Sequence, residues 1–401
     1  MSQHPVSEAP SRRKSLHQHQ KDFHARFGNG PGTRLFFAPG RVNLMGAHLD
    51  YNGGPVMPMA IDRGTFIAAR RRADRKVELA STLEKGVLST SLDDLPARPA
   101  GAWHDYPVGV LRHQLAGGGA PCGIELLFGG DLAIGAGLSS SASICVGTAF
   151  AVDRLWEQSG SLQRCVDAAL FGEREFVGVR CGIMDPYAVG FSRPDHLLWL
   201  DCRDASTRHL PLDGKRVSIA VADSGVRRDL AQGAFNERVA ECARVFELLR
   251  PFAPGARCLR DITADLVEEH ARLLGPTLLS RARHVAAEVA RTFRARDALL
   301  SGDLAGFGAA ITEAHGSLRD LFKVSIPELD LLVDAALDWD GVLGTRLTGA
   351  GFGGCTVILL RTEARPGLAE HVSESFRRRF GREPRVELFA GDSGPRELPA
   401  G

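Results

Sequence analysis

One segment constrains the fold more than any other: a glycine-rich stretch that leads through three serines into small and apolar residues, GGDLAIGAGLSSSASICVGTAFAVDRL at 129–155. The small and apolar run lasts more than three helical turns, which is typical of a helix packed on most of its sides. Glycines let the preceding backbone approach a ligand closely. The first amides and the dipole of the helix favour an anion. The segment therefore predicts a phosphate-binding loop in front of a buried helix.

This loop differs from two common nucleotide-binding patterns. A GxxxxGK[ST] pattern is absent, and Gly135-x-Gly137 is followed by Ser140 rather than by the last glycine of GxGxxG. The hydroxyls of Ser139, Ser140 and Ser141 could meet phosphate oxygens or a magnesium ion. Taken alone, the pattern fits a serine N-cap on a glycine-rich turn equally well.

The rest of the chain indicates two α+β domains. A length of 401 residues exceeds what one hydrophobic core usually supports. Strand and helix patterns are mixed in both halves without regular βαβ alternation, which argues against a doubly wound sheet. We predict a disordered polar tail at 1–20 and domains at 21–208 and 209–395, divided within the polar, turn-rich segment 203–215.

Charge and cysteine content exclude several classes of function. The formal charge is +1, from 49 basic and 48 acidic side chains, so no overall field favours a nucleic acid or a membrane surface. Eight scattered cysteines lack a CxxC pair, and the start of the chain lacks the apolar core of a secretory signal. A cytoplasmic protein with free thiols is expected, and monomer and homodimer both stay open.

Two carboxylates are candidates for chemistry. Asp185, in the turn CGIMDP, could orient or deprotonate an alcohol, although an aspartate before proline is more often a turn former. Glu173 lies twelve positions earlier, on the polar face of a helix predicted at 162–177. Its carboxylate could hold magnesium, which prefers oxygen ligands; by itself it would be a solvated helix residue.

Two glycine-bearing segments complete the pattern. In GRVNLMGAHLDYNGG, Arg41 could neutralise charge on a transferring phosphoryl group, while His48 and Asp50 could receive sugar hydroxyls. The run GAGFGG at 349–354 precedes the apolar strand CTVILL, and it permits close approach to a ligand or to the first domain. Read singly, the first is a loop with Asx-type hydrogen bonds and the second a tight turn.

These segments, in this order, resemble the galactokinases of the GHMP kinase superfamily, from about Phe23 to Leu388. GRVNLMGAHLDYNGG is similar to the signature GRVNLIGEHTDYN, and GAGLSSSAS to the superfamily's phosphate loop. Further counterparts are CGIMD, GVRRDLAQGAFNERVAEC, RARHV, SLRDLFKVSIPELD and TRLTGAGFGGC. The resemblance implies an N-terminal domain like ribosomal protein S5 domain 2 and a ferredoxin-like C-terminal domain, with the active site in the cleft between them.

The same resemblance implies a sugar kinase that uses ATP and Mg²⁺ to phosphorylate an anomeric hydroxyl. Asp185 would orient or deprotonate that hydroxyl, and Arg41 would stabilise the transferring group. The other implied contacts are ATP at Gly135, Gly137, Leu138, Ser139, Ser140, Ser141 and Trp103; magnesium at Ser141 and Glu173; and the sugar at Ala47, His48, Asp50, Gly182 and Phe235.

The chain departs from the galactokinase pattern where the sugar would lie. Ala47 replaces a glutamate that accepts a hydrogen bond from the carbon-6 hydroxyl, and Phe235 replaces a tyrosine. The lost acceptor is worth about 1–3 kcal/mol, and its lost charge would no longer repel a carboxylate at carbon 6. The sequence glycine-alanine-histidine at this place resembles galacturonokinases. Galactose and galacturonic acid are thus equal candidates, with L-arabinose as a third; Arg227 or Arg228 could meet an acid.

Two alternatives belong to other classes. A galactokinase-like sensor would bind sugar and ATP to engage a regulatory partner, but such sensors lack the Ser-Ala step that Ser141-Ala142 retains. Mevalonate or homoserine could replace the sugar, which the sugar-type signature between Arg41 and Tyr51 disfavours.

Overall fold

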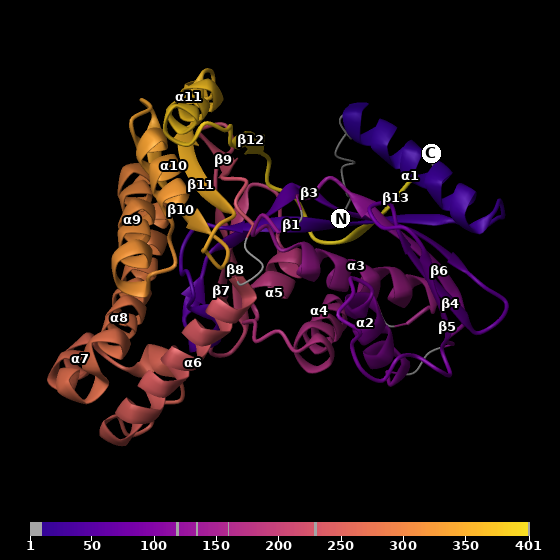
Figure 1. Ribbon diagram of the computed structural model, residues 1–401, viewed down its shortest axis with the longest axis horizontal. Helices are drawn as coiled ribbons and strands as arrows, with labels where there is room; N and C mark the ends of the chain where they lie inside the picture. The colour runs from indigo at the N-terminus through magenta and orange to yellow at the C-terminus, as the bar shows by residue number, and fades with distance from the viewer. Residues whose placement is uncertain (1–9, 118–119, 134, 159, 228–230, 400–401) are drawn as a thin grey trace.

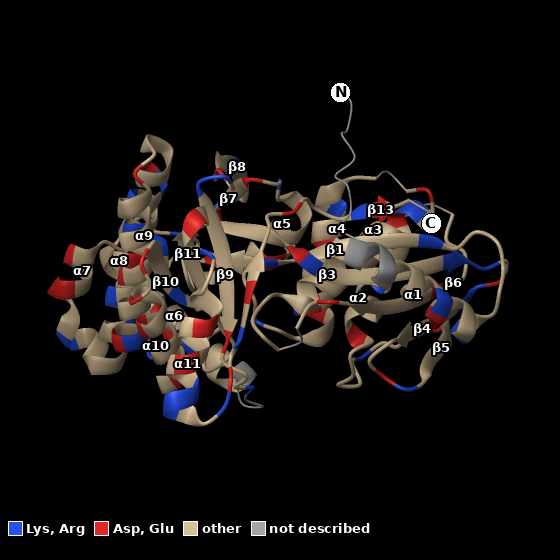
Figure 2. Cartoon of the chain, turned by 90° about the horizontal axis from the view of Figure 1, so that it is seen from above, with Lys and Arg blue, Asp and Glu red and all other residues tan. Residues whose placement is uncertain are grey.

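The computed structural model describes residues 10–117, 120–133, 135–158, 160–227 and 231–399. The chain forms two halves, each built on a large sheet (Figure 1). No helix in these ranges is long and apolar enough to cross a membrane. Basic and acidic residues are interspersed over the elements of both halves, in keeping with the balanced charge (Figure 2).

The first half contains a six-stranded sheet in the order β13-β1-β3-β6-β4-β5. Its neighbours are antiparallel except for the parallel pair β4 and β6. The strands are β1 (Arg34–Asn43), β3 (Pro58–Arg71), β4 (Lys76–Ser81), β5 (Val87–Ser91), β6 (Ile124–Gly130) and β13 (Arg396–Leu398). Successive β1 residues alternate between two cores: Phe36 packs with the buried helix α3, and Phe37 packs with α1.

The helices of the first half divide between the two faces of that sheet (Figure 1). One face carries α2 (Asp105–Leu115), α3 (Ser140–Leu155), α4 (Leu162–Leu170) and α5 (Met184–Phe191), and the other carries α1 (Pro10–Phe27). The helix predicted behind the glycine-rich loop is thus α3, and it is buried along most of its length. A small third sheet, β2-β7-β8, pairs β2 (Pro55–Val56), β7 (His196–Asp201) and β8 (Ser206–Pro211).

Two polar segments contain more regular structure than expected. Within the predicted tail, residues 10–20 begin helix α1, because Leu16 and Phe23 stand two turns apart and cover the back of the sheet. The polar segment 203–215 contains strand β8. Most side chains of this strand face water, so its sequence is as polar as that of a linker. The predicted division at 208/209 falls inside β8, and a domain division close to it stays a prediction.

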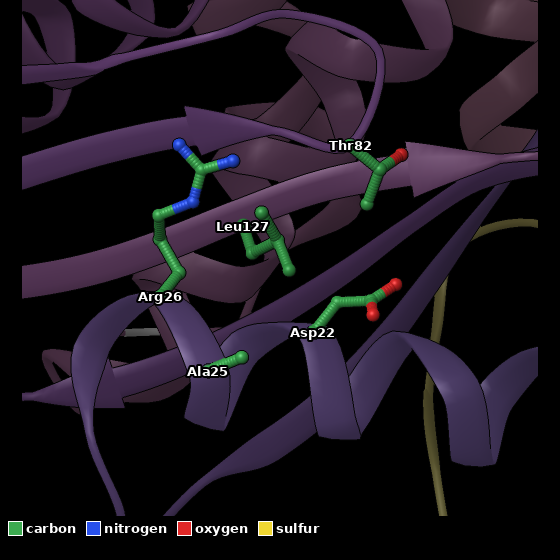
Figure 3. Close-up of a pocket in the computed structure, with 5 residues that line it drawn as sticks. All are labelled: Asp22, Ala25, Arg26, Thr82 and Leu127. Atoms are coloured by element: carbon green, nitrogen blue, oxygen red, sulfur yellow. The ribbon is translucent and has the colours of Figure 1, made fainter.

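A pocket lies between α1 and the back of the six-stranded sheet, away from the glycine-rich loop. Asp22, Ala25 and Arg26 line it from the helix, and Thr82 and Leu127 line it from the sheet (Figure 3). Arg26 Nη1 donates to the Gly86 carbonyl at 3.0 Å. The side chains that line this pocket therefore lie where α1 packs against the sheet.

The second half contains an antiparallel sheet in the order β10-β11-β9-β12. Its strands are β9 (Val217–Asp223), β10 (Val342–Thr348), β11 (Cys355–Arg361) and β12 (Arg385–Phe389). One face packs on α10 (Pro327–Leu337) and α11 (Leu368–Phe380), and the other on α8 (Ala271–Ser301) and α9 (Leu304–Ser317). Helices α6 (Ala231–Leu249) and α7 (Ala264–Glu269) extend this half (Figure 1). The mixed helices and largely antiparallel sheets confirm the α+β prediction.

Candidate active site

The glycine-rich loop ends at helix α3, which begins at Ser140. Gly135, Gly137 and Ser139 all have positive φ, of 69°, 80° and 62°. Left-handed backbone is easy for glycine but costs a serine energy, and such strained residues cluster at functional sites. The carbonyls of Gly137 and Leu138 accept hydrogen bonds from Arg41 Nη1 at 2.6 Å and from its backbone N–H at 3.1 Å. The loop is therefore held by β1, the strand that carries Arg41.

The second glycine run packs directly against this loop. A Cβ on Gly349 would lie 3.0 Å from the Gly137 Cα, and a Cβ on Gly354 would lie 3.0 Å from the Ala136 carbonyl oxygen. Side chains at these positions would push the two backbones apart. Of the two roles predicted for residues 349–354, close approach to the first domain is confirmed.

Arg41 and Asp185 form a two-pronged ion pair. Nε and Nη2 of Arg41 each lie 2.8 Å from one Asp185 oxygen, and the Ser139 hydroxyl donates to Oδ2. Arg41 is 4% exposed and the Asp185 side chain 26% exposed, so the carboxylate keeps one open side. Asp185 stands in the first turn of α5, where the helix dipole favours a negative charge, and not in the isolated turn that we predicted. The paired arginine and the serine thus fix the orientation of an accessible carboxylate.

Glu173 is buried, so the expectation that it lies on a polar, solvated helix face was wrong. It stands in η2 (Phe171–Val177), a π-helical turn that continues α4. An extra residue in a turn rotates the side chains that follow, and such turns are frequent at functional sites. Burial raises the pKa of Glu173 to about 7, against a hydrogen bond from Ser141 that lowers it. Its Oε2 has no partner in the described part of the chain.

Asp50 and Gly182 lie in direct contact. A Cβ on Gly182 would stand 1.9 Å from Asp50 Oδ2, so only glycine allows this approach. Removal from water, together with repulsion from Asp185, raises the pKa of Asp50 to about 6. Asp50 therefore comes together with two predicted site residues from a distant part of the chain, Gly182 and Asp185.

His48 lies in an aromatic enclosure. Its Nδ1 is 2.9 Å from the Tyr51 hydroxyl, and its ring centroid is 4.8 Å from that of Phe322 and 5.9 Å from that of Phe235. Burial, with the nearby His284, Arg346 and Arg238, lowers the pKa of His48 to about 3. The ring is therefore neutral at physiological pH, and its buried Nε2 has no partner among the described residues.

Family models and known relatives match the sequence of this chain. The galactokinase galactose-binding signature matches residues 21–71, and the GHMP kinase N- and C-terminal domains match 105–193 and 295–380. A galactokinase of a Roseiflexus species is 40% identical over 93% of this chain and 94% of its own length. The galactokinase of Enterococcus faecalis is 38% identical over 92% of this chain and 96% of its own length. The galactokinase of Bos taurus is 37% identical over 92% of this chain and 94% of its own length.

The chain belongs to the galactokinase family. The crystal structure of Lactococcus lactis galactokinase complexed with galactose superposes with a TM-score of 0.92 at 32% identity, covering 96% of this chain and all of that one. Methanococcus jannaschii mevalonate kinase, at a TM-score of 0.66 and 19% identity over 90% of this chain and 99% of its own, shares the fold alone. The predicted two-domain GHMP kinase fold is confirmed. The chain is a phosphotransferase that acts on an alcohol group, in a family that uses ATP as phosphate donor.

Two of the positions at which this chain departs from the galactokinase pattern, Ala47 and Phe235, lie at the His48 enclosure. Ala47 is buried, and its N–H donates to Glu288 Oε1 at 3.1 Å. Phe235, on α6, meets the Tyr51 ring edge-on at a centroid distance of 5.6 Å. The Ala47 and Phe235 side chains therefore offer no polar atom on this side of the galactokinase site.

Two further predictions concern residues at the edge of the site. Trp103 packs against the rings of Phe128 and His104, so its place beside an adenine stays a prediction. Arg227, one of the two candidates for meeting a substrate acid, pairs with Asp223 and lies against Gly135 of the phosphate loop, so that role stays a prediction. The other candidate, Arg228, lies outside the described residues.

Sequence reasoning missed three residues that shape the site: Tyr51, Glu288 and Arg346. Tyr51 holds His48, and Glu288 with Arg346 supports the loop in front of it. The motif RARHV offered a signal, because Glu288 follows its His284 by one helical turn, which places the two polar side chains on the same face of α8. Buried polar residues at that spacing indicate a partner from elsewhere in the fold.

Proposed function

We propose that this galactokinase-family chain transfers the γ-phosphoryl group of ATP to the anomeric hydroxyl of galactose or galacturonic acid, which gives a sugar 1-phosphate and ADP. The observation that carries the proposal is the Arg41–Asp185 pair, which lies between the phosphate loop and Asp50. A nucleotide on the loop and a sugar at Asp50 would therefore meet at these two side chains. Phosphoryl transfer needs positioning and charge stabilisation more than covalent help from the protein.

In the proposed reaction, Asp185 and Arg41 have different roles. The open side of Asp185 accepts a hydrogen bond from the anomeric hydroxyl and directs its oxygen at the γ-phosphorus. Arg41, already aligned by Asp185 and the Gly137 carbonyl, stabilises charge on the transferring group. The new oxygen–phosphorus bond forms as the bond to the ADP oxygen breaks. The hydroxyl proton leaves by way of the Asp185 carboxylate.

The residues present fit a magnesium ion. Glu173 Oε2 is buried without a protein partner in the described ranges, and the Ser141 hydroxyl lies on the same carboxylate. Magnesium usually binds one or two protein oxygens and completes its shell with phosphates and water, so the lack of three clustered acidic or histidine ligands among the described residues does not conflict. When bound, the ion would neutralise phosphate charge, and Ser141 and Glu173 would hold it.

Magnesium binding is expected to weaken as the pH falls through about 7. The raised pKa of Glu173, about 7, means that the free carboxyl is largely protonated at pH 6, where about a tenth remains ionised. Because a cation binds only the carboxylate, the apparent Kd for magnesium should rise about tenfold between pH 8 and pH 6. Calorimetric titration of magnesium into protein with a non-hydrolysable ATP analogue measures this.

Glu173→Gln supplies the matched control, since it keeps the side-chain volume and removes the titrating proton. The variant should bind magnesium more weakly at pH 8 and lose the part of the pH dependence that the protein contributes. The part contributed by the nucleotide should remain in both proteins. Identical pH profiles would contradict a role for Glu173.

The identity of the sugar is decided by a substrate panel. ADP release should be measured with purified protein, magnesium-ATP and galactose, galacturonic acid, L-arabinose, glucuronic acid or N-acetylgalactosamine. The relatives named galactokinase support galactose, whereas Ala47 supports galacturonic acid. L-Arabinose, which lacks carbon 6, would make the chain an arabinokinase. Tight sugar and ATP binding without ADP release would indicate a sensor, and higher activity on mevalonate or homoserine would refute a sugar acceptor.

A further inference from the structure

A buried carboxylate from the second half supports the loop in front of His48. Glu288, on α8, is completely buried. Its Oε1 accepts the N–H groups of both Gly46 and Ala47 at 3.1 Å. Those two residues directly precede His48 and lie more than 240 positions away in sequence. The loop that carries His48 is thus attached to a helix of the other half.

These two amides depend on that carboxylate. Gly46 has a φ of 82°, and a Cβ there would stand 2.2 Å from the Pro55 carbonyl oxygen, so the chain turns sharply with no space for a side chain. Ordinary backbone hydrogen bonds serve the flanking residues: Leu44 N–H donates to Met57, and Leu49 N–H to Gly46. Removing the Glu288 oxygen would leave two buried donors without a partner, which costs more than an exposed hydrogen bond.

The charge of Glu288 holds a second link to the same loop. Arg291 donates to Oε2, and Arg346 Nη1 lies 3.5 Å from Oε1. Arg346 is 1% exposed, and its Nη2 donates to the carbonyl of Asn43, the last residue of β1, at 3.1 Å. Burial lowers the pKa of Arg346 to about 10, and Glu288 opposes that shift. A buried arginine without its counter-ion would move or take up water.

We propose that Glu288 is a positioning residue for the acceptor sugar: it fixes the backbone of Gly46 and Ala47 and, through Arg346, the end of β1, and so places His48. The inference rests on the proposed sugar-kinase function. Glu288 itself lies behind the loop, where it would not touch the substrate. Its removal should therefore weaken sugar binding more than nucleotide binding, because the phosphate loop is held separately by Arg41.

Two replacements separate hydrogen bonding from charge. Glu288→Gln keeps an oxygen that can accept both N–H groups but removes the charge, whereas Glu288→Met removes both at similar size. We expect the methionine variant to raise KM for the best sugar by about tenfold or more. KM for ATP should stay within about twofold. The glutamine variant should recover part of the sugar affinity and, as the closer mimic, is the one expected to fold.

Glu313→Gln is the matched control. Glu313, on α9, is half-exposed and also pairs with Arg291, but it has no hydrogen bond to the loop among the described contacts. It should leave both KM values unchanged. Sugar binding without ATP, measured by calorimetry, should follow the same order as KM.

The outcomes distinguish failure of the proposed sugar-kinase function from failure of the positioning role of Glu288. If the wild-type protein phosphorylates none of the five sugars, the proposed function fails. If it phosphorylates one, and folded Glu288→Gln shows wild-type sugar KM and sugar Kd, the positioning role is overturned. A fall in kcat with both KM values unchanged would mean fewer folded molecules, and would equally overturn it. A selective rise in sugar KM, smaller for glutamine than for methionine, supports it.

Discussion

Replacing Asp185 by alanine is expected to lower kcat for the best sugar by about 10³-fold or more. The substitution removes the acceptor that would orient the anomeric hydroxyl, an effect worth about 10²–10⁴-fold where such a group acts in the transition state. It also frees Arg41, whose Nε and Nη2 are both aligned by this carboxylate. Steady-state ADP release, with ATP and sugar varied in turn, measures kcat and both KM values.

Stability is the main competing explanation, because Asp185→Ala leaves Arg41 buried without its counter-ion. Asp74→Ala is a suitable control: Asp74 makes the same two-pronged contact with Arg72, at 2.7 and 2.8 Å, on an exposed turn. It should keep full activity. Thermal unfolding of both variants shows whether they are folded at the assay temperature. Full turnover by folded Asp185→Ala would overturn the proposed role.

Asp185→Asn adds a test of mechanism. The amide keeps one oxygen acceptor and nearly the same shape, but it cannot take a proton and pairs poorly with Arg41. If asparagine retains most of the activity, orientation of the hydroxyl dominates. If asparagine is as inactive as alanine, the charge or the proton transfer is required.

Much of the fold follows from local patterns. The largely apolar run at 217–222 lies in the fully buried strand β9, as strands covered on both faces require. The small-residue run after Ser140 is a helix packed on most sides. Glycines at 349 and 354 mark a close backbone approach that their spacing alone suggested. These features depend on neighbours in sequence, so they could be predicted.

Other features depend on partners far along the chain. Glu173 occupies a position that helical periodicity assigns to solvent, but the π-helical turn and the neighbouring phosphate loop bury it. The start of α1 is polar in sequence, and only the back of the sheet gives Leu16 a buried place. The sequence alone does not indicate that Glu288 supports the site, because its contact with Gly46 forms only in the folded chain. Hydrophobic periodicity cannot predict such long-range pairings, although resemblance to a known family can indicate them.

If the sugar binds as proposed, with carbon 6 near position 47, that position is the best place to change specificity. Arg346 and Arg238 both act on His48 electrostatically, and each also pairs with a carboxylate, Glu288 and Glu241 respectively. Arg238 Nε and Arg346 Nε are buried without a hydrogen-bond partner in the described part of the chain. Galactokinases place a glutamate where this chain has Ala47, which would reduce that positive charge. Without it, a carboxylate on the substrate would enter a positive environment and meet no repulsion from position 47.

Ala47→Glu is therefore expected to reduce kcat/KM for galacturonic acid by about 10²-fold or more. Two carboxylates about 4 Å apart repel by about 4 kcal/mol at an effective dielectric constant of 20, enough for that loss after partial screening. The same variant should raise kcat/KM for galactose by about tenfold, since the new acceptor meets the carbon-6 hydroxyl. Both sugars should be assayed at saturating magnesium-ATP.

Ala47→Gln separates charge from size in this experiment. Glutamine fills the same space and accepts the same hydrogen bond, but it does not repel a carboxylate. If charge governs selection, Ala47→Gln keeps most of the activity on galacturonic acid, and only Ala47→Glu loses it. Equal losses in both variants would show that the pocket excludes bulk at position 47. No change with either sugar would mean that position 47 does not face carbon 6, and the case for an acidic substrate would then fail.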